Sequence, residues 1–98
     1  MKRVKTILKG IPSVRNFTSN SGNEVANQFK IYFNNGVLFQ SYTSIIAIKL
    51  DDGRVFLDGK TWNYSKTTGK YRNYFLGEGI AETREKIKNG SYILTDLN

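Results

Sequence analysis

The fold is decided by residues 25–58, which read VANQFKIYFNNGVLFQSYTSIIAIKLDDGRVFLD. Over residues 25–33 apolar and polar side chains alternate with a period of two, which is typical of a strand with one buried face. The two faces of this strand hold Val25, Phe29, Ile31 and Phe33 on one side and Gln28, Lys30 and Tyr32 on the other. The segment therefore predicts a half-buried β-strand.

Two turn signals divide the rest of this stretch. Asn34-Asn35-Gly36 predicts a three-residue hairpin loop in which Gly36 takes the left-handed conformation, at little cost to glycine. Asp52-Gly53 predicts a two-residue hairpin that sets Asp51 opposite Arg54 as a cross-strand charge pair. These turns join the strands of an antiparallel β-meander.

The turns also fix which residues face each other across the meander. The alternation of apolar and polar residues is interrupted over residues 41–44, which indicates a bend or bulge inside one long strand. We therefore expect a three-stranded antiparallel meander over residues 25–58. Its expected pairs are Phe33 with Val37, Ile31 with Phe39, Lys30 with Gln40, Leu50 with Val55 and Ile48 with Leu57.

The C-terminal part predicts one or two short helices and a final strand, which makes the fold class α+β. Ser65 is a good N-cap for a helix that ends at Gly77. A second helix over about Ile80 to Asn89 has its acids early and its bases late, which suits the helix dipole, and Gly90 terminates it. Ser91–Leu97 predicts the strand.

The first 24 residues carry weaker signals. Val4–Leu8 predicts a strand, Pro12 interrupts the pattern, and Thr18–Asn23 predicts a polar loop. A chain of 98 residues is the size of one domain. We expect a single domain with three parts: an N-terminal segment (1–24), the meander (25–58), and a basic–aromatic helical segment with the final strand (60–98).

Composition restricts the location of the protein. The chain has no cysteine, so it can form neither a disulfide nor a thiolate site. It lacks the apolar run of a signal peptide and any stretch of about 20 apolar residues that would span a bilayer. We therefore expect no membrane association and a location in the cytoplasm.

The same composition argues against catalysis. The chain has no histidine and no cysteine, which removes the commonest bases, nucleophiles and metal ligands. The adjacent carboxylates Asp51-Asp52 are accounted for by the predicted turn. We therefore expect a protein that is not an enzyme and that uses no metal and no cofactor.

Net charge and its distribution indicate an anionic partner. The charge is +7, and residues 60–76 read KTWNYSKTTGKYRNYFL, five aromatics and four cations without an acid. Aromatic rings stack on nucleobases, while lysine and arginine neutralise phosphates. We take these cations and exposed aromatics, with the basic N-terminus, as the candidate nucleic-acid or partner-binding residues: Lys60, Tyr64, Lys66, Lys70, Arg72, Tyr74, Lys2, Arg3 and Lys5. Trp62, Tyr71 and Phe75 serve either as core or as contact surface.

Several segments of the sequence carry a family resemblance: Trp62–Asn73 with Phe75–Gly77, Glu82-Thr83, Lys86–Gly90 and Leu94–Asn98, and Phe39–Tyr42 with Ile45–Ala47. With these segments the sequence resembles, over about residues 27–98, small uncharacterised proteins of phages and prophages of Gram-positive bacteria. That family carries no assigned activity, so no functional residue is transferred from it. The resemblance implies a viral accessory protein that acts on host machinery in the bacterial cytoplasm.

Three functions remain open. The first is a phage accessory protein that binds nucleic acid or a host nucleoprotein, including a CRISPR effector. The second is an inhibitor of a bacterial defence system, an anti-CRISPR or another anti-defence factor, that binds its target protein directly. The third is a sponge for a nucleotide messenger. In each case the edge strands of a small sheet can pair into a homodimer.

Overall fold

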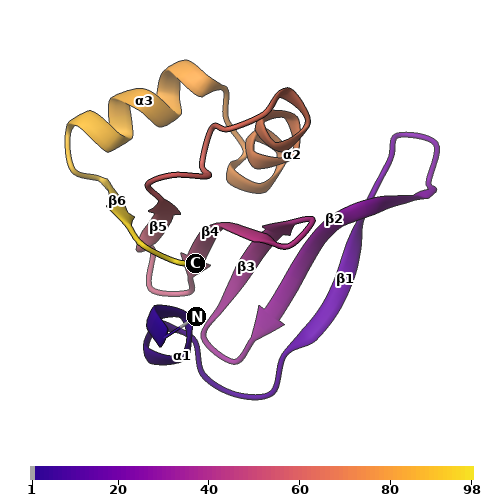
Figure 1. Ribbon diagram of the computed structural model, residues 1–98, viewed down its shortest axis with the longest axis horizontal. Coiled ribbons are helices and arrows are strands. Elements are labelled where there is room, and N and C mark those ends of the chain that lie inside the picture. The colour runs from indigo at the N-terminus through magenta and orange to yellow at the C-terminus, as the bar shows by residue number, and fades with distance from the viewer. Residues whose placement is uncertain (1) are drawn as a thin grey trace.

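The computed structural model describes residues 2–98, except for the side chains of Lys2, Arg3 and Lys5. Six strands form one sheet in chain order; every neighbouring pair is antiparallel except β5–β6, which is parallel. This arrangement confirms the α+β class with its meander, C-terminal helices and final strand (Figure 1). The elements are α1 (Lys2–Ile7), β1 (Ser13–Thr18), β2 (Glu24–Phe33), β3 (Gly36–Ser41), β4 (Ser44–Leu50), β5 (Val55–Asp58), α2 (Lys66–Leu76), α3 (Ile80–Lys88) and β6 (Tyr92–Thr95).

The meander has four strands where the sequence predicted three. The predicted bend over residues 41–44 is a complete reversal of the chain, in which Ser41 pairs with Ser44 around Tyr42-Thr43. Tyr42 adopts a φ of 55°, a region that residues with large side chains seldom occupy. Because neither residue is glycine or asparagine, the sequence carries no ordinary signal for this turn.

The first predicted loop is shorter than expected. Phe33 pairs with Gly36 and not with Val37, so the turn consists of Asn34-Asn35 alone. Gly36 has no positive φ, which corrects its expected left-handed conformation. It is needed for a different reason, because a Cβ there would lie 2.6 Å from the carbonyl oxygen of Lys49. The one-residue shift continues along the ladder and sets Lys30 opposite Phe39 instead of Gln40.

The second predicted loop is longer than expected. The Leu50 amide donates to the carbonyl of Arg54 at 2.9 Å, which makes a three-residue loop of Asp51–Gly53. Gly53 has a φ of 97°, the left-handed position that such loops require. Arg54 pairs with Asp52 at 2.9 Å in the same loop, and not with Asp51. The register consequently sets Lys49 opposite Val55.

The N-terminal segment also differs from the prediction. Val4–Leu8 lies in and just after a helix, because Val4 and Leu8, four residues apart, share one helical face that packs on the sheet. A strand, β1, follows Pro12 where none was expected. The connection between them clamps the Asn34-Asn35 turn, since the Asn35 amide donates to the carbonyl of Ile7 and its oxygen accepts from the amide of Lys9.

The C-terminal elements confirm the sequence prediction. The hydroxyl of Ser65 accepts from the Thr68 amide at 3.1 Å, and Gly77 ends α2 with a φ of 70°. The second helix and the final strand lie within one or two residues of their expected bounds. In the part of the chain that is described, no helix is long and apolar enough to cross a membrane.

The sheet has a core on each face. Figure 1 shows α2 and α3 over one face and α1 below the other. The core under α2 contains Phe17, Phe39, Ile46, Ala47, Val55, Leu57, Tyr71 and Phe75. The core between the sheet and α1 contains Val4, Leu8, Leu38, Ile45, Ile48, Leu50 and Leu97. The C-terminal residue Asn98 closes the second core with both side-chain atoms on Ile45: its oxygen accepts from the Ile45 amide at 2.7 Å, and its nitrogen donates to the Ile45 carbonyl at 2.9 Å.

A buried side-chain amide on β2 has no hydrogen-bond partner among the residues that the structure describes. Gln28 is 1% exposed, and neither its Oε1 nor its Nε2 makes a hydrogen bond to any described residue. An unpaired polar group in a core costs about 1–3 kcal/mol. We expect Gln28→Met, which keeps the length of the side chain, to raise the free energy of unfolding by about 1 kcal/mol in urea titrations.

The control for this prediction is Gln40→Met on the next strand. The Gln40 amide donates to the carbonyl of Tyr42 at 2.8 Å, so the same substitution there removes a hydrogen bond and is expected to lower stability. A Gln28→Met protein that is less stable than the parent would contradict the interpretation.

Candidate functional site

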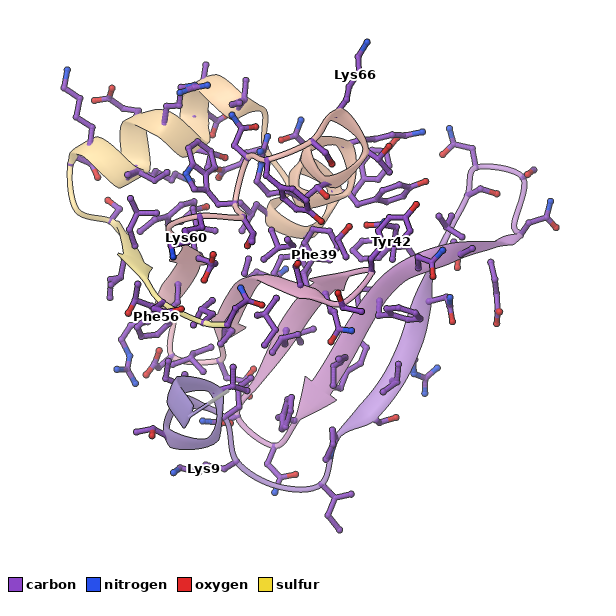
Figure 2. The ribbon with its side chains drawn as sticks, in the orientation of Figure 1. Lys9, Phe39, Tyr42, Phe56, Lys60 and Lys66 are labelled. Atoms are coloured by element: carbon purple, nitrogen blue, oxygen red, sulfur yellow. The ribbon has the colours of Figure 1, made fainter. Side chains whose placement is uncertain are left out.

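The predicted basic–aromatic residues do not form one surface. Lys60, Tyr64 and Lys66 are exposed, but none of the three lines the large groove described below. Figure 2 shows Lys66 at the outer end of α2, directed away from the sheet, and Lys60 on the opposite side of that helix, near β5. The side chains of Lys2, Arg3 and Lys5 lie outside the described residues. Lys66, Lys70 and Tyr74 follow one another at successive turns along the exposed side of α2, and of these three Lys70 and Tyr74 line the hollows described below.

Arg72 is a structural residue, which corrects its expected role in binding. Its side chain is 1% exposed, and its guanidinium donates to the carbonyl of Trp62 and the side-chain oxygens of Asn63 and Asn73 at 2.8–3.0 Å. Burial, and then the charge of Arg84, lower the pKa of Arg72. The guanidinium also lies 5.4 Å from the centre of the Trp62 ring. Arg72 therefore fixes the segment that leads into α2 and is not available to an anion.

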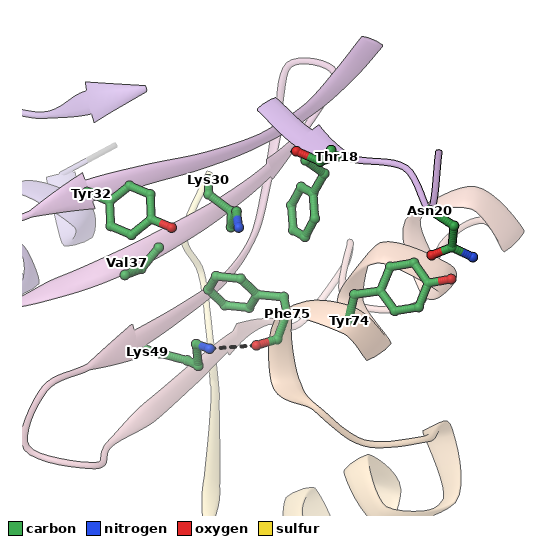
Figure 3. Close-up of a pocket in the computed structure, with 9 residues that line it drawn as sticks. Thr18, Asn20, Lys30, Tyr32, Val37, Lys49, Tyr74 and Phe75 are labelled. Atoms are coloured by element: carbon green, nitrogen blue, oxygen red, sulfur yellow. Dashed lines mark hydrogen bonds between the residues drawn. The ribbon is translucent and has the colours of Figure 1, made fainter. Parts of the chain in front are cut away.

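A groove lies beside α2, on the part of the sheet that the helix leaves uncovered. Its volume is about 500 Å³, within the range of small-molecule sites. The strands supply Lys30, Tyr32, Val37 and Lys49, and α2 supplies Tyr74 and Phe75. In Figure 3, Tyr32 and Tyr74 stand at opposite ends, with Lys30 and Phe75 between them. The groove thus combines cations with exposed aromatic rings.

Aromatic rings form the floor of the groove. The ring of Phe39 lies 5.3 Å from that of Phe17 and 5.7 Å from that of Phe75, between centroids. Each lysine rests on one of these rings: Lys30 Nζ lies 5.2 Å from the centre of Phe17, and Lys49 Nζ lies 4.5 Å from the centre of Phe75. Such contacts orient the ammonium groups without neutralising them.

No carboxylate among the residues that line the groove balances the charges of Lys30 and Lys49. Lys49 donates to the Phe75 carbonyl at 2.6 Å, while Lys30 forms no ion pair or hydrogen bond with the described residues. Partial burial, and then repulsion from Lys30, lower the pKa of Lys49. An anion placed between the two groups would relieve this repulsion.

Two further hollows share lining residues with the groove. One of about 480 Å³ adds Arg15, another of about 50 Å³ adds Lys70, and Thr18 lines all three. Glu24, in the first of these two, is the one carboxylate among the residues that line the three hollows. We treat the three together as one basic–aromatic groove between Arg15 and Lys70.

Sequence reasoning missed most of this groove. The alternation over residues 25–33 predicts Lys30 and Tyr32 on the polar side of a strand, and Lys49 lies between apolar neighbours in the sequence, so neither pattern indicates a binding site. The available signal is that lysine and tyrosine occupy neighbouring polar positions, Lys30 and Tyr32, of a strand whose other face is apolar. The spacing along the chain gave no indication that these residues meet.

The fold and the groove define a small α+β protein with a basic–aromatic surface cleft. The chain belongs to DUF8033, a family of unknown function, whose family model matches residues 12–91. Every residue that lines the groove lies inside this segment. No curated protein and no solved structure matches the chain.

Proposed function

We propose that this protein binds nucleic acid, free or within a nucleoprotein, and that the ligand lies in the groove between Arg15 and Lys70. The observation that carries the proposal is the pair Lys30 and Lys49, two ammonium groups over an aromatic floor in the central part of the groove, which no carboxylate lines. Phosphates neutralise such a pair, and exposed tyrosines stack on bases. Nucleic acid supplies both kinds of group at regular spacing.

We propose binding without a chemical step. General acid–base catalysis near neutral pH draws most often on histidine, and the chain has neither histidine nor cysteine. The lowered pKa of Lys49 has a structural cause in burial and in Lys30. The proposed role is therefore that of an accessory protein that covers or redirects a nucleic acid.

Fluorescence anisotropy with labelled oligonucleotides over a range of salt concentrations tests the proposal. We expect binding whose affinity falls with salt, with a log–log slope of about −0.7 for each phosphate contacted on a single strand. Weak binding that does not respond to salt would overturn it.

Removing one positive charge from the groove tests whether the nucleic acid binds there. We expect Lys30→Gln to reduce the steepness of the salt dependence by about 0.7 and to weaken binding about fivefold near 0.1 M salt, because one phosphate contact is lost. The matched control is Lys88→Gln, which removes the same charge from the exposed end of α3, away from every residue that lines the groove. Equal effects of the two substitutions would show that binding follows net charge and not this groove.

The alternative of a defence inhibitor that binds protein directly gives a different result. A pull-down from bacterial lysate with and without nuclease separates the two cases, since partners held through nucleic acid are lost after digestion. Partners that persist after digestion and after Lys30→Gln would favour the inhibitor.

A further inference from the structure

We propose that the groove selects single-stranded nucleic acid, with one backbone phosphate between Lys30 and Lys49 and a neighbouring base stacked on Tyr74. This inference rests on the proposed function and adds to it the strandedness of the ligand and the role of each residue. It is carried by the position of the two lysines over the aromatic floor and by the exposure of the Tyr74 ring.

The proposed phosphate position, between Lys30 and Lys49, follows from the contacts that hold the two side chains. Lys49 is fixed by its bond to the Phe75 carbonyl and by the Phe75 ring, so its ammonium is positioned before any ligand arrives. Lys30 lies over Phe17 on the neighbouring side of the groove and keeps its hydrogen-bond donors unpaired with any described residue. A phosphate between them accepts from both and replaces a like-charge repulsion with two attractions.

The base platform is Tyr74. Its side chain is 56% exposed, while its ring meets that of Tyr71 edge-on at 5.7 Å between centroids and an interplanar angle of 78°. Since Tyr71 is buried in the core, this contact holds the Tyr74 ring in place and leaves a large part of it open to solvent. A ring oriented in advance loses little conformational freedom when a base stacks on it.

Selection for single strands follows from the need for an open base face. In a duplex both faces of each base are covered by neighbouring base pairs. A duplex therefore offers its phosphates to the lysines of the groove but no base to Tyr74. A single strand can place a base on the ring and a phosphate in the groove together. Duplex binding would then retain only the contribution of charge.

The experiment compares three labelled ligands of equal length: a single strand, its duplex, and a strand in which the central nucleotides are abasic. We expect the single strand to bind about 5- to 150-fold more tightly than either of the others at the same salt concentration, because only the single strand stacks a base on Tyr74. Tyr74→Ala should weaken single-strand binding by about 5- to 150-fold and leave abasic and duplex binding unchanged. Tyr74→Phe keeps the ring and should keep the affinity.

The outcomes separate this inference from the proposed function. Equal affinity for single strand and duplex, both reduced by Lys30→Gln, would overturn strand selection while the proposed function stands. Salt-independent weak binding of all three ligands would overturn both. Equal loss with Tyr74→Ala and Tyr74→Phe would remove the stacking role, provided that thermal melts show both variants folded.

Discussion

Replacing Asp58 with alanine is expected to lower the free energy of unfolding by about 3–4 kcal/mol. The carboxylate is buried at the end of β5, and its two oxygens accept from the amides of Lys60, Thr61 and Leu97 and from the Thr61 hydroxyl at 2.8–3.0 Å. Alanine leaves these donors without their acceptor. Because the free energy of unfolding of such a protein is about 5–15 kcal/mol in total, this loss is a large share of its stability.

Urea denaturation measures this change against two reference variants. Asp58→Asn keeps one acceptor oxygen and should fall between the parent and the alanine variant. Asp51→Ala removes the same charge from the exposed β4–β5 turn and should change stability by less than about 0.5 kcal/mol. An Asp58→Ala protein that is as stable as Asp51→Ala would show that the buried hydrogen bonds contribute nothing.

The second large effect is expected at Glu78, which joins α3 to β6. Its side chain is 3% exposed and accepts from Thr83 Oγ1 at 2.6 Å, Lys86 Nζ at 2.7 Å and Tyr92 Oη at 2.7 Å. Glu78→Gln leaves the Lys86 charge without its partner and brings an amide donor to a site that needs acceptors. We expect a loss of about 2–4 kcal/mol in urea denaturation at pH 7.

This substitution should also change the response to acid. Burial alone would raise the pKa of Glu78, but the hydrogen bonds from Lys86, Thr83 and Tyr92 outweigh it and hold the pKa below its usual 4.5. A carboxyl whose pKa is lowered by folding stabilises the protein fully above its unfolded pKa and loses that contribution as the pH falls through the folded value. We therefore expect the parent to lose stability below about pH 4.5.

Titrations in urea at several pH values between 7 and 3 test the sign. Glu78→Gln should lose less stability over this range than the parent does, while the exposed Glu85→Gln on the same helix should follow the parent. Asp58, whose pKa is also lowered by its hydrogen bonds against the effect of burial, contributes to the remaining dependence at the acid end, as does Asp52, whose pKa is lowered by its hydrogen bonds with Arg54. Equal acid sensitivity in the parent and Glu78→Gln would contradict this assignment.

The elements that sequence reasoning predicted well are those defined by local chemistry. Ser65 and Gly77 mark both ends of α2 because capping is a contact within one helical turn. The predicted hairpin registers were wrong because each turn makes contacts with distant segments. In the first turn, Asn35 is bound by the α1–β1 connection. In the second, the Asp51 amide donates to the carbonyl of Asn35 at 2.9 Å. Neither partner can be inferred from the turn residues themselves.

The residues of the site divide in the same way, into those that local sequence predicts and those that only distant contacts bring together. Tyr74 and Lys70 were predicted because they stand in a stretch rich in aromatics and cations, and Arg72 was included for the same reason although the fold buries it. Composition does not distinguish an exposed cation from one that pairs with carbonyl groups. Lys30 and Lys49 meet because β2, β3 and β4 are neighbours in the sheet, and the one-residue register shift turns Lys30 toward Phe39.

The bonds between Asn98 and Ile45 have a consequence for the order of folding. The two residues are 53 positions apart, and the segment that must close before they meet contains β5, α2, α3 and β6. Until this segment closes, the backbone of Ile45 lacks both of its bonds to the Asn98 side chain. The contact therefore belongs to the later steps of folding, and Asn98→Ala should raise the rate of unfolding more than it lowers the rate of refolding.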